Sequence, residues 1–540
     1  MMLTATHDWI HLFDGEATGE LVKALPDIMR TRRWFGGKAR HIRSVDIVDC
    51  IAIPSDSLCL LLLIRVQYEQ AEPETYTLPV TAAFGDDAER IHRELAPAVI
   101  APFVLYRDGK RENGLLYDAL WNRDFALGLL NAVSRDAQFT GVAGCLTASS
   151  TDAFPDLMPK TLHPEPVVMN AEQSNTSVAY NRSVILKVYR RVEAGINLDL
   201  EMSRALTHVR FPYVPLLAGA LEYQFASGAP LTLGVLQQFA ANDGNAWQYS
   251  MDAVNRFFQR LRSAPLDEAR ASHVPLRPLD SVHEPYAPLA GQLVGEDLGW
   301  AERLGRRTAQ LHRALSQLTE DPAFAPEPLT RDYQRARRTA IERGMAEAVM
   351  LLNERTPILS RAGQEQASRL ARLTPALEPL LMAFEELTGS VMRIRCHGDY
   401  HLGQVLCTKA DFMIIDFEGE PARSLAERRM KHPVLLDIAG MIRSFHYVPC
   451  AFVKEQGLEP SRWSAYWSGW MSSAFVKGYL STANGAECWP DNPDHVALLL
   501  DLYLVEKALY ELRYELNNRP AWVDIPLNGL MTLLSQEQRR

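Results

Sequence analysis

Residues 396–420, CHGDYHLGQVLCTKADFMIIDFEGE, contain the pattern that decides the expected fold. Asp399 lies five residues before Gln404, and Asp416 follows seventeen residues after Asp399, beyond an apolar strand-like run. Phosphoryl transfer to a hydroxyl group requires a carboxylate beside the acceptor and oxygen ligands for Mg²⁺ on the nucleotide phosphates. The spacing therefore predicts Asp399 as the catalytic residue and Gln404 and Asp416 as metal ligands.

Two histidines, His397 and His401, flank Asp399, and this arrangement alone could also suggest a metal site. They lack a third ligand at a fitting spacing, so phosphoryl transfer explains the segment better. An HGD tripeptide is often only a surface turn. Its combination with Gln404 and the following IIDFE favours a phosphotransferase core.

A polar segment upstream, residues 173–177, lies between two expected strands and is predicted to bind the phosphates of ATP. Small polar residues let backbone N–H groups and hydroxyls approach an anion, although such a sequence alone is a common turn. The residues are Gln173, Ser174, Asn175, Thr176 and Ser177.

The next expected strand, 183–189, places Lys187 in an apolar run, where an unpaired charge is costly. We predict Glu201, on the following helix, as its partner, and contacts from Lys187 to the phosphates. A lysine that merely extends to solvent from an edge strand is the alternative.

The expected strand 231–239 ends directly before the chain changes to long amphipathic helices. In a two-lobed kinase this position is the hinge, whose backbone pairs with adenine. We therefore predict ATP contacts from Gln237, Gln238 and Phe239, on their order along the chain rather than on their residue types.

Three segments differ in character along the 540 residues. Residues 1–100 contain short β-rich runs, and residues 101–240 contain mixed helical patterns followed by the strands that carry the phosphate loop and hinge. Residues 241–540 carry apolar residues at helical spacing, interrupted by a β-containing patch at 391–417. We predict an α+β protein with a bilobal, protein-kinase-like fold: an N-terminal segment 1–100, an intermediate segment and β-rich lobe 101–240, and a large helical lobe 241–540.

Composition and charge exclude several classes of protein. The net charge is −10, with 47 % apolar and 23 % charged residues, as in an ordinary soluble globular protein. An acidic balance gives no bulk attraction to nucleic acid or to anionic lipid. The seven cysteines are odd in number and form no CxxC, which favours free thiols in a reducing compartment. No signal peptide or membrane-spanning run is evident, so we expect a cytoplasmic protein without nucleic-acid or membrane partners.

The expected helix at 502–516 has two unlike faces. Leu502, Val505, Leu509, Leu512 and Leu516 share one face, and Tyr503, Lys507, Tyr510 and Tyr514 lie roughly opposite. An aromatic stripe turned away from the core needs a partner. Tyrosine rings can stack on sugar C–H surfaces, which favours a sugar site. The alternative is packing against another helix or against residues 519–526.

Several segments together resemble the maltokinase family: QSNTS at 173–177, LKVYRR at 186–191, NLDLE at 197–201, HGDYHLGQVL at 397–406, DFEGEPARSLAERR at 416–429, RWFGGK at 33–38 and EKALYELRYELNNRP at 506–520. The resemblance runs through nearly the whole chain. HGD-x-H is shared by many small-molecule kinases, whereas DFEGEPAR and KALYELRYELNNRP are much narrower. The resemblance implies an aminoglycoside-phosphotransferase-like fold with an N-terminal cap subdomain at 1–100.

The resemblance also implies an activity. The expected reaction, with ATP and Mg²⁺, transfers the γ-phosphate to the anomeric hydroxyl of maltose and gives maltose 1-phosphate for α-glucan, glycogen and trehalose metabolism. Family members often work beside trehalose synthase, which makes a complex with that enzyme an expected partnership. The predicted sugar contacts are His401, Glu418, Arg423, Arg428, Lys507, Tyr510 and Tyr514. Leu436 stands where the family pattern has an arginine before Asp437, which we expect to anchor the catalytic loop.

Two alternatives remain open from the sequence. The same fold could phosphorylate another acceptor such as glucosamine, glucose or an aminoglycoside, although several ammonium groups would favour a carboxylate-rich pocket rather than Lys507. A non-catalytic pseudokinase that acts as a scaffold in a trehalose synthase complex is an alternative of another class. The presence of Lys187, Asp399, Gln404 and Asp416 together argues against it.

Overall fold

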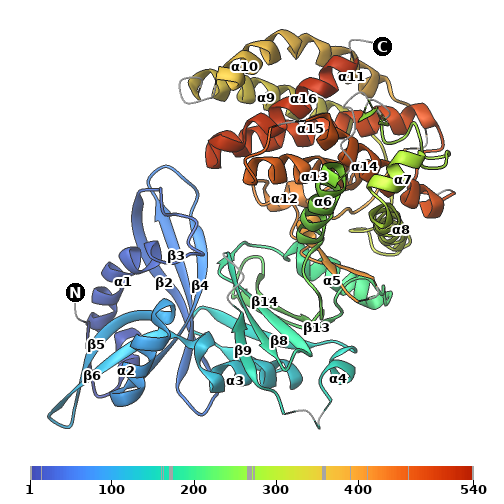
Figure 1. The fold of residues 1–540 in the computed structure, drawn as a ribbon. Helices are drawn as coiled ribbons and strands as arrows, with labels where there is room; N and C mark the ends of the chain where they lie inside the picture. The colour runs from blue at the N-terminus through green and yellow to red at the C-terminus, as the bar shows by residue number, and fades with distance from the viewer. Residues whose placement is uncertain are drawn as a thin grey trace. The chain divides into compact units, whose positions relative to one another are not determined.

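Two units make up this computed structural model (Figure 1). The first comprises Met1–Arg210 and Pro215–Ala241, and the second comprises Phe211–Val214 and Asn242–Arg540. The structure describes residues 3–13, 15–159, 161, 163–169, 174–263, 270–271, 274–275, 277–355, 361–389, 391–409, 411–459, 461–483 and 485–537. The second unit thus starts at Asn242, beside the predicted start of the helical lobe at 241, and it also takes four residues from the preceding segment.

The first unit contains two sheets. The first sheet has the strand order β1-β5-β6-β4-β3-β2, and β12 also pairs with β4. Its strands are β1 (Leu3–Thr6), β2 (Ile42–Ile53), β3 (Cys59–Tyr68), β4 (Glu74–Phe84), β5 (Val99–Arg107), β6 (Lys110–Asp118) and β12 (Arg191–Val192). The helices α1 (Gly15–Arg30) and α2 (Gly85–Glu94) belong to the same part of the chain. The sheet continues to Asp118, beyond residue 100, where we placed the end of the N-terminal segment.

Strand β3 explains why its sequence is continuously apolar. Leu60, Leu62 and Ile64 belong to the hydrophobic core around α1, whereas Leu61 and Leu63 belong to the core of the second sheet. Successive side chains of a strand point to opposite faces, so both faces of β3 are covered. This strand therefore joins the two cores of the first unit.

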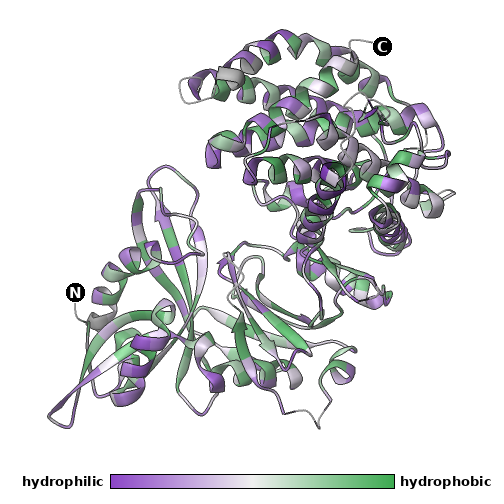
Figure 2. Cartoon of the chain, in the orientation of Figure 1, coloured by the Kyte–Doolittle hydropathy of each residue, from purple (hydrophilic) through white to green (hydrophobic). Residues whose placement is uncertain are grey.

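The second sheet has the strand order β7-β8-β13-β14-β11-β10-β9. Figure 2 shows its central strands largely in green, the colour of hydrophobic residues. The strands are β7 (Gln138–Thr140), β8 (Gly144–Ser150), β9 (Pro166–Met169), β10 (Asn175–Tyr180), β11 (Val184–Tyr189), β13 (Leu217–Phe225) and β14 (Leu231–Gln238), with helices α3 (Arg123–Ser134), α4 (Phe154–Leu157) and α5 (Leu198–His208). Helix α5 begins at the predicted place because the Asn197 side chain accepts hydrogen bonds from the next turn.

Buried polar contacts tie the two sheets together. The Arg190 guanidinium, which follows β11, contacts the Asp118 carboxylate at the end of β6 and lies 5.4 Å from the Trp34 ring. The Tyr223 hydroxyl on β13 donates to Asp49 Oδ2 on β2 at 2.5 Å. Trp34, in the RWFGGK segment, therefore has a structural contact with the β-rich lobe.

The second unit is mainly helical. Its helices are α6 (Ala246–Ser263), α7 (Pro288–Leu293), α8 (Glu296–Ser316), α9 (Arg331–Arg355), α10 (Arg361–Leu373), α11 (Leu377–Glu386), α12 (Leu425–Arg428), α13 (Leu435–Glu455), α14 (Arg462–Ala483), α15 (Pro493–Asn518) and α16 (Asp524–Glu537). Two short hairpins pair β15 (Glu327–Pro328) with β16 (Met392–Arg393) and β17 (Val405–Cys407) with β18 (Phe412–Ile414). The β-containing patch at 391–417 was predicted, and the mixture of helices and sheets agrees with the predicted α+β class.

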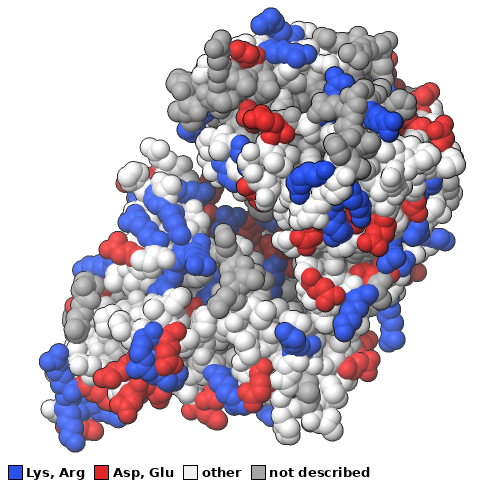
Figure 3. All heavy atoms as spheres, viewed as in Figure 1, with Lys and Arg blue, Asp and Glu red and all other residues white. Residues whose placement is uncertain are grey.

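The surface carries both signs of charge. Figure 3 shows Lys and Arg interspersed with Asp and Glu over much of the face in view. All seven cysteines are free thiols. Among the described residues, no helix combines the length and the apolar character needed to cross a membrane.

Candidate active site

One face of helix α13 holds the loop that carries Asp399. Asp437, in the first turn of α13, accepts the His397 N–H at 2.8 Å on Oδ2 and the Gly398 N–H at 3.0 Å on Oδ1. Two turns later, Ser444 Oγ accepts the Leu402 N–H at 3.1 Å. These contacts fix the backbone on both sides of Asp399, as expected for Asp437.

Gly440 lies between those two anchors and lets the loop approach the helix closely. A Cβ atom at this position would lie 2.6 Å from the Tyr400 carbonyl oxygen, a distance that real Cβ atoms do not show. The sequence did not identify Gly440 or Ser444 as part of the site. The recurrence of Asp, Gly and Ser at positions 437, 440 and 444 on one helical face is the signal that could have found them.

A buried histidine orients Asp437 from behind. His312 Nε2 lies 3.0 Å from Asp437 Oδ2, and His312 Nδ1 lies 2.9 Å from the Tyr479 hydroxyl. The ring therefore bridges Asp437 and Tyr479. Burial alone would raise the pKa of Asp437, but the hydrogen bond and charge of His312 hold it below its usual value. Asp437 thus stays ionised as it accepts the loop N–H groups.

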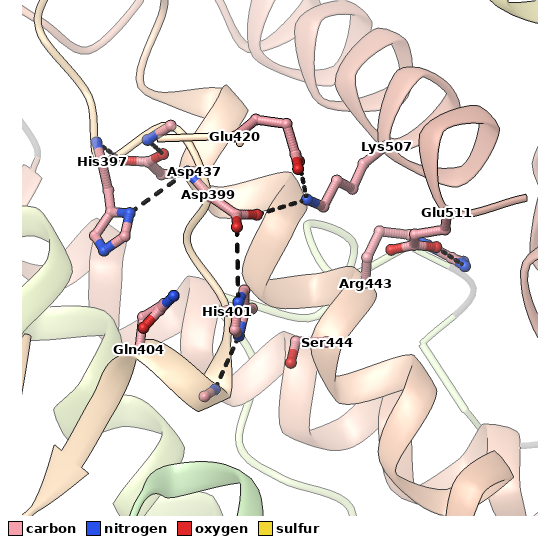
Figure 4. A network of polar contacts seen from close by, with 12 residues as sticks. His397, Asp399, His401, Gln404, Glu420, Asp437, Arg443, Ser444, Lys507 and Glu511 are labelled. Carbon is pink, nitrogen blue, oxygen red and sulfur yellow. Dashed lines mark hydrogen bonds and ion pairs between the residues drawn. The ribbon is translucent and has the colours of Figure 1, made fainter. Parts of the chain in front are cut away.

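Asp399 forms an ion pair with Lys507 of helix α15 (Figure 4). Lys507 Nζ, on α15, lies 2.9 Å from Asp399 Oδ1. Burial would raise the pKa of Asp399, but the charge and hydrogen bond of Lys507, together with the nearby histidines, lower that pKa below its ordinary value. The same attraction raises the pKa of Lys507, against the effect of its burial. Asp399 is therefore ionised and turned toward α15.

Glu420 is the second carboxylate on Lys507, and the sequence analysis did not select it. Its Oε2 lies 3.2 Å from Lys507 Nζ, and its side chain also accepts a hydrogen bond from Tyr510. Burial and the nearby charge of Asp399 raise the pKa of Glu420. The second glutamate of DFEGE was the available signal.

His401 faces Asp399 from the other side of the loop. His401 Nδ1 accepts the Gly403 N–H at 3.0 Å, so the ring proton lies on Nε2, which is 3.8 Å from Asp399 Oδ2. Burial lowers the pKa of His401, which favours the neutral ring. His401 therefore presents an N–H toward the Asp399 carboxylate.

The predicted metal ligands lie together. Gln404 Nε2 donates to Asp416 Oδ2 at 2.9 Å, and the Ile415 N–H donates to the Gln404 carbonyl at 3.0 Å across the β17–β18 hairpin. Asp416 has φ = 68°, a left-handed conformation that is uncommon outside glycine and often found at functional sites. Carboxylate and amide oxygens are the donors that Mg²⁺ prefers, so this pair fits that ion.

Two of the predicted tyrosines lie on the same face of α15 as Lys507. Lys507 Nζ is 4.7 Å from the centre of the Tyr510 ring, and the Tyr510 and Tyr514 ring centres lie 6.3 Å apart with an interplanar angle of 28°. Tyr514 is 44 % exposed. Tyr503, which we placed on this stripe, is instead buried, and its hydroxyl lies 3.0 Å from that of Tyr333. Helix α9, which carries Tyr333, covers Tyr503.

The remaining predicted sugar contacts build the loop after Asp416. Arg423 Nη2 donates to Glu506 Oε1 on α15 at 2.9 Å. Arg428 Nη1 donates to the Glu418 carbonyl oxygen at 3.0 Å. These arginines have partners within the protein, and their contact with a sugar stays a prediction, as it does for Glu418.

The predicted nucleotide residues lie in the first unit. Lys187 Nζ is 3.5 Å from Asp199 Oδ2, and the Tyr189 hydroxyl donates to the same oxygen at 3.0 Å. The sequence analysis did not select Asp199, and the predicted pairing of Lys187 with Glu201, two residues later on α5, stays a prediction. The first turn of α5 was the only signal in the sequence for a partner of Lys187, and this turn contains both Asp199 and Glu201.

The phosphate segment is partly a strand. Gln173 lies outside the described residues, and Ser174 precedes β10. Asn175, Thr176 and Ser177 belong to β10 rather than to the loop, and Thr176 Oγ1 accepts from Arg190 Nε at 2.9 Å. Strand pairing therefore starts earlier than the polar sequence indicated.

The hinge residues already use their backbone N–H groups. The Gln238 N–H donates to the Leu216 carbonyl at 2.7 Å, and the Phe239 N–H donates to the Ser183 carbonyl at 2.9 Å. The Gln237 side chain donates to Ser203 Oγ at 2.9 Å. Adenine recognition through these N–H groups is therefore disfavoured, and the ATP contacts of this stretch stay predictions.

Two segments of the chain match known families. Residues 29–121 match the family described as the maltokinase N-terminal cap domain, and residues 242–449 match the phosphotransferase enzyme family. The first match spans most of the first sheet, and the second includes the whole loop from His397 to Asp416.

Curated relatives are glucosamine kinases. That of Streptacidiphilus jiangxiensis is 25 % identical over 237 residues, which are 44 % of this chain and 49 % of that protein, so the match spans about half the length of the relative. That of Mycolicibacterium smegmatis is 21 % identical over 373 residues, 68 % of this chain and 79 % of that protein.

Solved structures of a glucosamine kinase share the fold. The complex with glucosamine, ADP and inorganic phosphate has a TM-score of 0.61 and 19 % identity, and covers 95 % of this chain and 98 % of its own. Crystal form B gives a TM-score of 0.60 at 19 % identity, with 96 % and 99 % covered. Residues 29–121 are therefore similar to the maltokinase N-terminal cap domain, residues 242–449 are similar to the phosphotransferase enzyme family, and the chain shares the fold of these glucosamine kinase structures.

Proposed function

We propose that this protein is a sugar kinase that transfers the γ-phosphate of ATP to the anomeric hydroxyl of maltose. The observation that carries the proposal is the Asp399–Lys507 ion pair, which lies beside the tyrosines of α15. A carboxylate paired with a lysine that lies beside one half-buried and one exposed tyrosine, Tyr510 and Tyr514, is suited to a polyhydroxyl acceptor with an apolar face. The maltokinase-type cap and the sugar-kinase relatives support the same class of reaction.

Asp399 acts on the acceptor in this mechanism. Its ionised carboxylate accepts a hydrogen bond from the anomeric hydroxyl and takes the proton as the oxygen attacks phosphorus. An anomeric hydroxyl is more acidic than an ordinary alcohol, so a carboxylate of low pKa is a sufficient base. Lys507 holds the Oδ1 atom of Asp399, which leaves Oδ2 and the His401 N–H to orient the acceptor.

Nucleotide contacts are proposed for two sets of residues. Lys187 would contact the α- and β-phosphates, and Asp199 keeps its ammonium group in place. Gln404 and Asp416 would hold Mg²⁺, which when bound neutralises charge on the phosphate oxygens. Catalysis by this set is mainly positioning and charge stabilisation.

Glucosamine is the second candidate acceptor. The observation that favours it is the pair of carboxylates, Asp399 and Glu420, that share a single lysine, because the ammonium group of an amino sugar could also pair with one of them. The names of the relatives point the same way. Participation in α-glucan metabolism, association with a trehalose synthase and a cytoplasmic location stay predictions.

One assay distinguishes the acceptors. ADP release is measured with ATP and Mg²⁺ on maltose, glucose, glucosamine, trehalose and kanamycin, and the product is tested for acid-labile phosphate. We expect turnover on maltose, an acid-labile product, loss of turnover with EDTA, and an Asp399→Asn variant that binds ATP without turnover. Turnover on glucosamine alone would replace maltose as the proposed acceptor. ATP binding without turnover on any acceptor would favour the pseudokinase alternative.

A further inference from the structure

Two neighbouring residues of α15 hold the same loop. This loop, residues 417–429, follows the metal ligand Asp416 and contains the short helix α12. Glu420, near its start, contacts Lys507, and Arg423, three residues later, contacts Glu506. The loop is therefore attached to consecutive positions of one rigid helix.

The 417–429 loop is cross-linked within itself. The Arg428 side chain donates from Nη1 to the Glu418 carbonyl at 3.0 Å and from Nε to the Arg423 carbonyl at 3.1 Å. The Arg423 N–H donates to the Glu420 carbonyl at 3.0 Å, and Ser424 caps α12 with a capping box. The loop thus behaves as one piece, so the point that fixes Arg423 also fixes Glu420.

Glu506 is buried between two arginines. Its Oε1 atom lies 2.6 Å from Arg337 Nη1, on α9, and 2.9 Å from Arg423 Nη2. Arg337 also contacts His432 Nδ1 at 2.8 Å, just after the loop. Among the residues that the structure describes, Glu506 Oε2 accepts no hydrogen bond, so both arginines depend on a single oxygen. Removal of this charge would leave the buried guanidinium of Arg337 beside the half-buried guanidinium of Arg423 without the carboxylate that they share.

We propose that Glu506 is a positioning residue for the sugar acceptor: by holding Arg423, it sets the 417–429 loop so that Glu420 meets Lys507. The proposal rests on the proposed function. Its chain of contacts runs from α9 through Glu506 and Arg423 to Glu420, and Glu420 and Asp399 then share the Lys507 ammonium group. Lys507 stands between the catalytic carboxylate and the acceptor surface, so an error in the position of Glu420 disturbs acceptor binding before it disturbs ATP binding.

The test compares Glu506→Gln with a matched control. The glutamine keeps the shape and one acceptor oxygen but removes the charge. The control, Glu347→Gln, breaks an ion pair between the same two helices, from Glu347 on α9 to Arg513 on α15, and touches no residue of the loop. Steady-state kinetics with maltose and glucosamine, and with ATP varied separately, are combined with hydrogen exchange of peptides that cover residues 417–429.

We expect Glu506→Gln to lower kcat/KM for the sugar at least tenfold, mainly through KM, with the KM for ATP changed less than twofold. Hydrogen exchange in the 417–429 loop should become faster in that variant and stay unchanged in Glu347→Gln. Arg423→Gln should give the same effects, and the double variant should be no worse than the worse single variant, because both break one contact.

Exchange and kinetics separate the two proposals. A folded Glu506→Gln variant whose loop exchanges like the wild type would overturn the positioning role, as would equal losses for sugar and ATP. If the wild type phosphorylates no sugar, the proposed function fails, and the exchange experiment still decides whether Glu506 holds the loop. If Glu506→Gln does not fold, Arg423→Gln replaces it, because Glu506 then still pairs with Arg337. Unchanged hydrogen exchange in the loop and an unchanged KM for the sugar in Arg423→Gln would also overturn the positioning role.

Discussion

Replacement of Lys507 by methionine should disable catalysis and shift its pH dependence. Methionine retains the length and apolar stem of lysine, so the change removes the charge and three hydrogen-bond donors with little loss of packing. In the wild type, this ammonium group lies 2.9 Å from Asp399 and 3.2 Å from Glu420. The variant would therefore leave two buried carboxylates beside each other without their cation.

The size of the effect follows from these distances. At 2.9 Å and an effective dielectric constant of 20, two unit charges attract by about 6 kcal/mol before desolvation is subtracted. Breaking a buried ion pair by removal of one partner commonly costs about 3–5 kcal/mol. If about 3 kcal/mol of this appears in the transition state, where the γ-phosphate approaches an already anionic site, kcat falls about 100-fold.

The pH profile gives the sign of the electrostatic effect. Asp399 must be ionised to accept the proton, and Lys507 holds the pKa of Asp399 below its ordinary value. In the wild type, activity therefore persists to acidic pH and is lost as the pH falls through that low pKa. Without Lys507, burial and the Glu420 charge raise the pKa of Asp399, so the acidic limb of kcat should move to higher pH.

The assay is ADP release at saturating ATP and sugar between pH 5 and 9. Lys431→Met is the control. Lys431 is also a buried lysine, and its ammonium group lies 2.6 Å from Glu327 Oε1 and contacts neither Asp399 nor Glu420. We expect the control to keep the wild-type profile. A Lys507→Met variant with the wild-type kcat and an unmoved acidic limb would refute the electrostatic role of Lys507.

Three further changes test the support of the site. Gly440→Ala should destabilise the protein by about 1–3 kcal/mol, because its Cβ would meet the Tyr400 carbonyl at 2.6 Å; thermal unfolding with an unchanged Tm would contradict this. Asp437→Asn should lower kcat, measured as ADP release, about 10–100-fold, because the loop N–H groups lose their charged acceptor. Equal rates would show that the loop keeps its conformation without this charge. Arg190→Leu should lower the free energy of unfolding by about 3–5 kcal/mol, because Asp118 would stay buried without its guanidinium partner. Urea titration measures this loss, and an unchanged unfolding midpoint would contradict it.

Local patterns in the sequence predicted much of the fold. The strand 184–189 and the helix after Asn197 were identified because an apolar run and a capping residue are local signals. The spacing of Asp399, Gln404 and Asp416 predicted a cluster, and the structure places Gln404 and Asp416 in contact. Their roles in catalysis and metal binding stay predictions.

What the sequence did not predict depends on tertiary packing. Asp199 lies in the first turn of α5, and only the position of β11 brings its carboxylate within reach of Lys187. Tyr503 shares a helical face with Lys507, but α9 buries it, and no local pattern announces a covering helix 170 residues away. Helical periodicity therefore gives the faces of a helix but not their neighbours.

The four residues Phe211–Val214 have a consequence for how the chain can be divided. They belong to the second unit although strands of the first unit precede and follow them, so the chain passes between the units at 210/211, 214/215 and 241/242. Within the second unit, the Tyr213 carbonyl accepts the Ile414 N–H at 2.8 Å, and the Arg307 guanidinium lies 4.1 Å from the Tyr213 ring. A fragment that starts at residue 242 would lack this strip and leave the edge of the β17–β18 hairpin incomplete. Biosynthesis therefore delivers part of the C-terminal lobe early, before the residues on which it packs have left the ribosome.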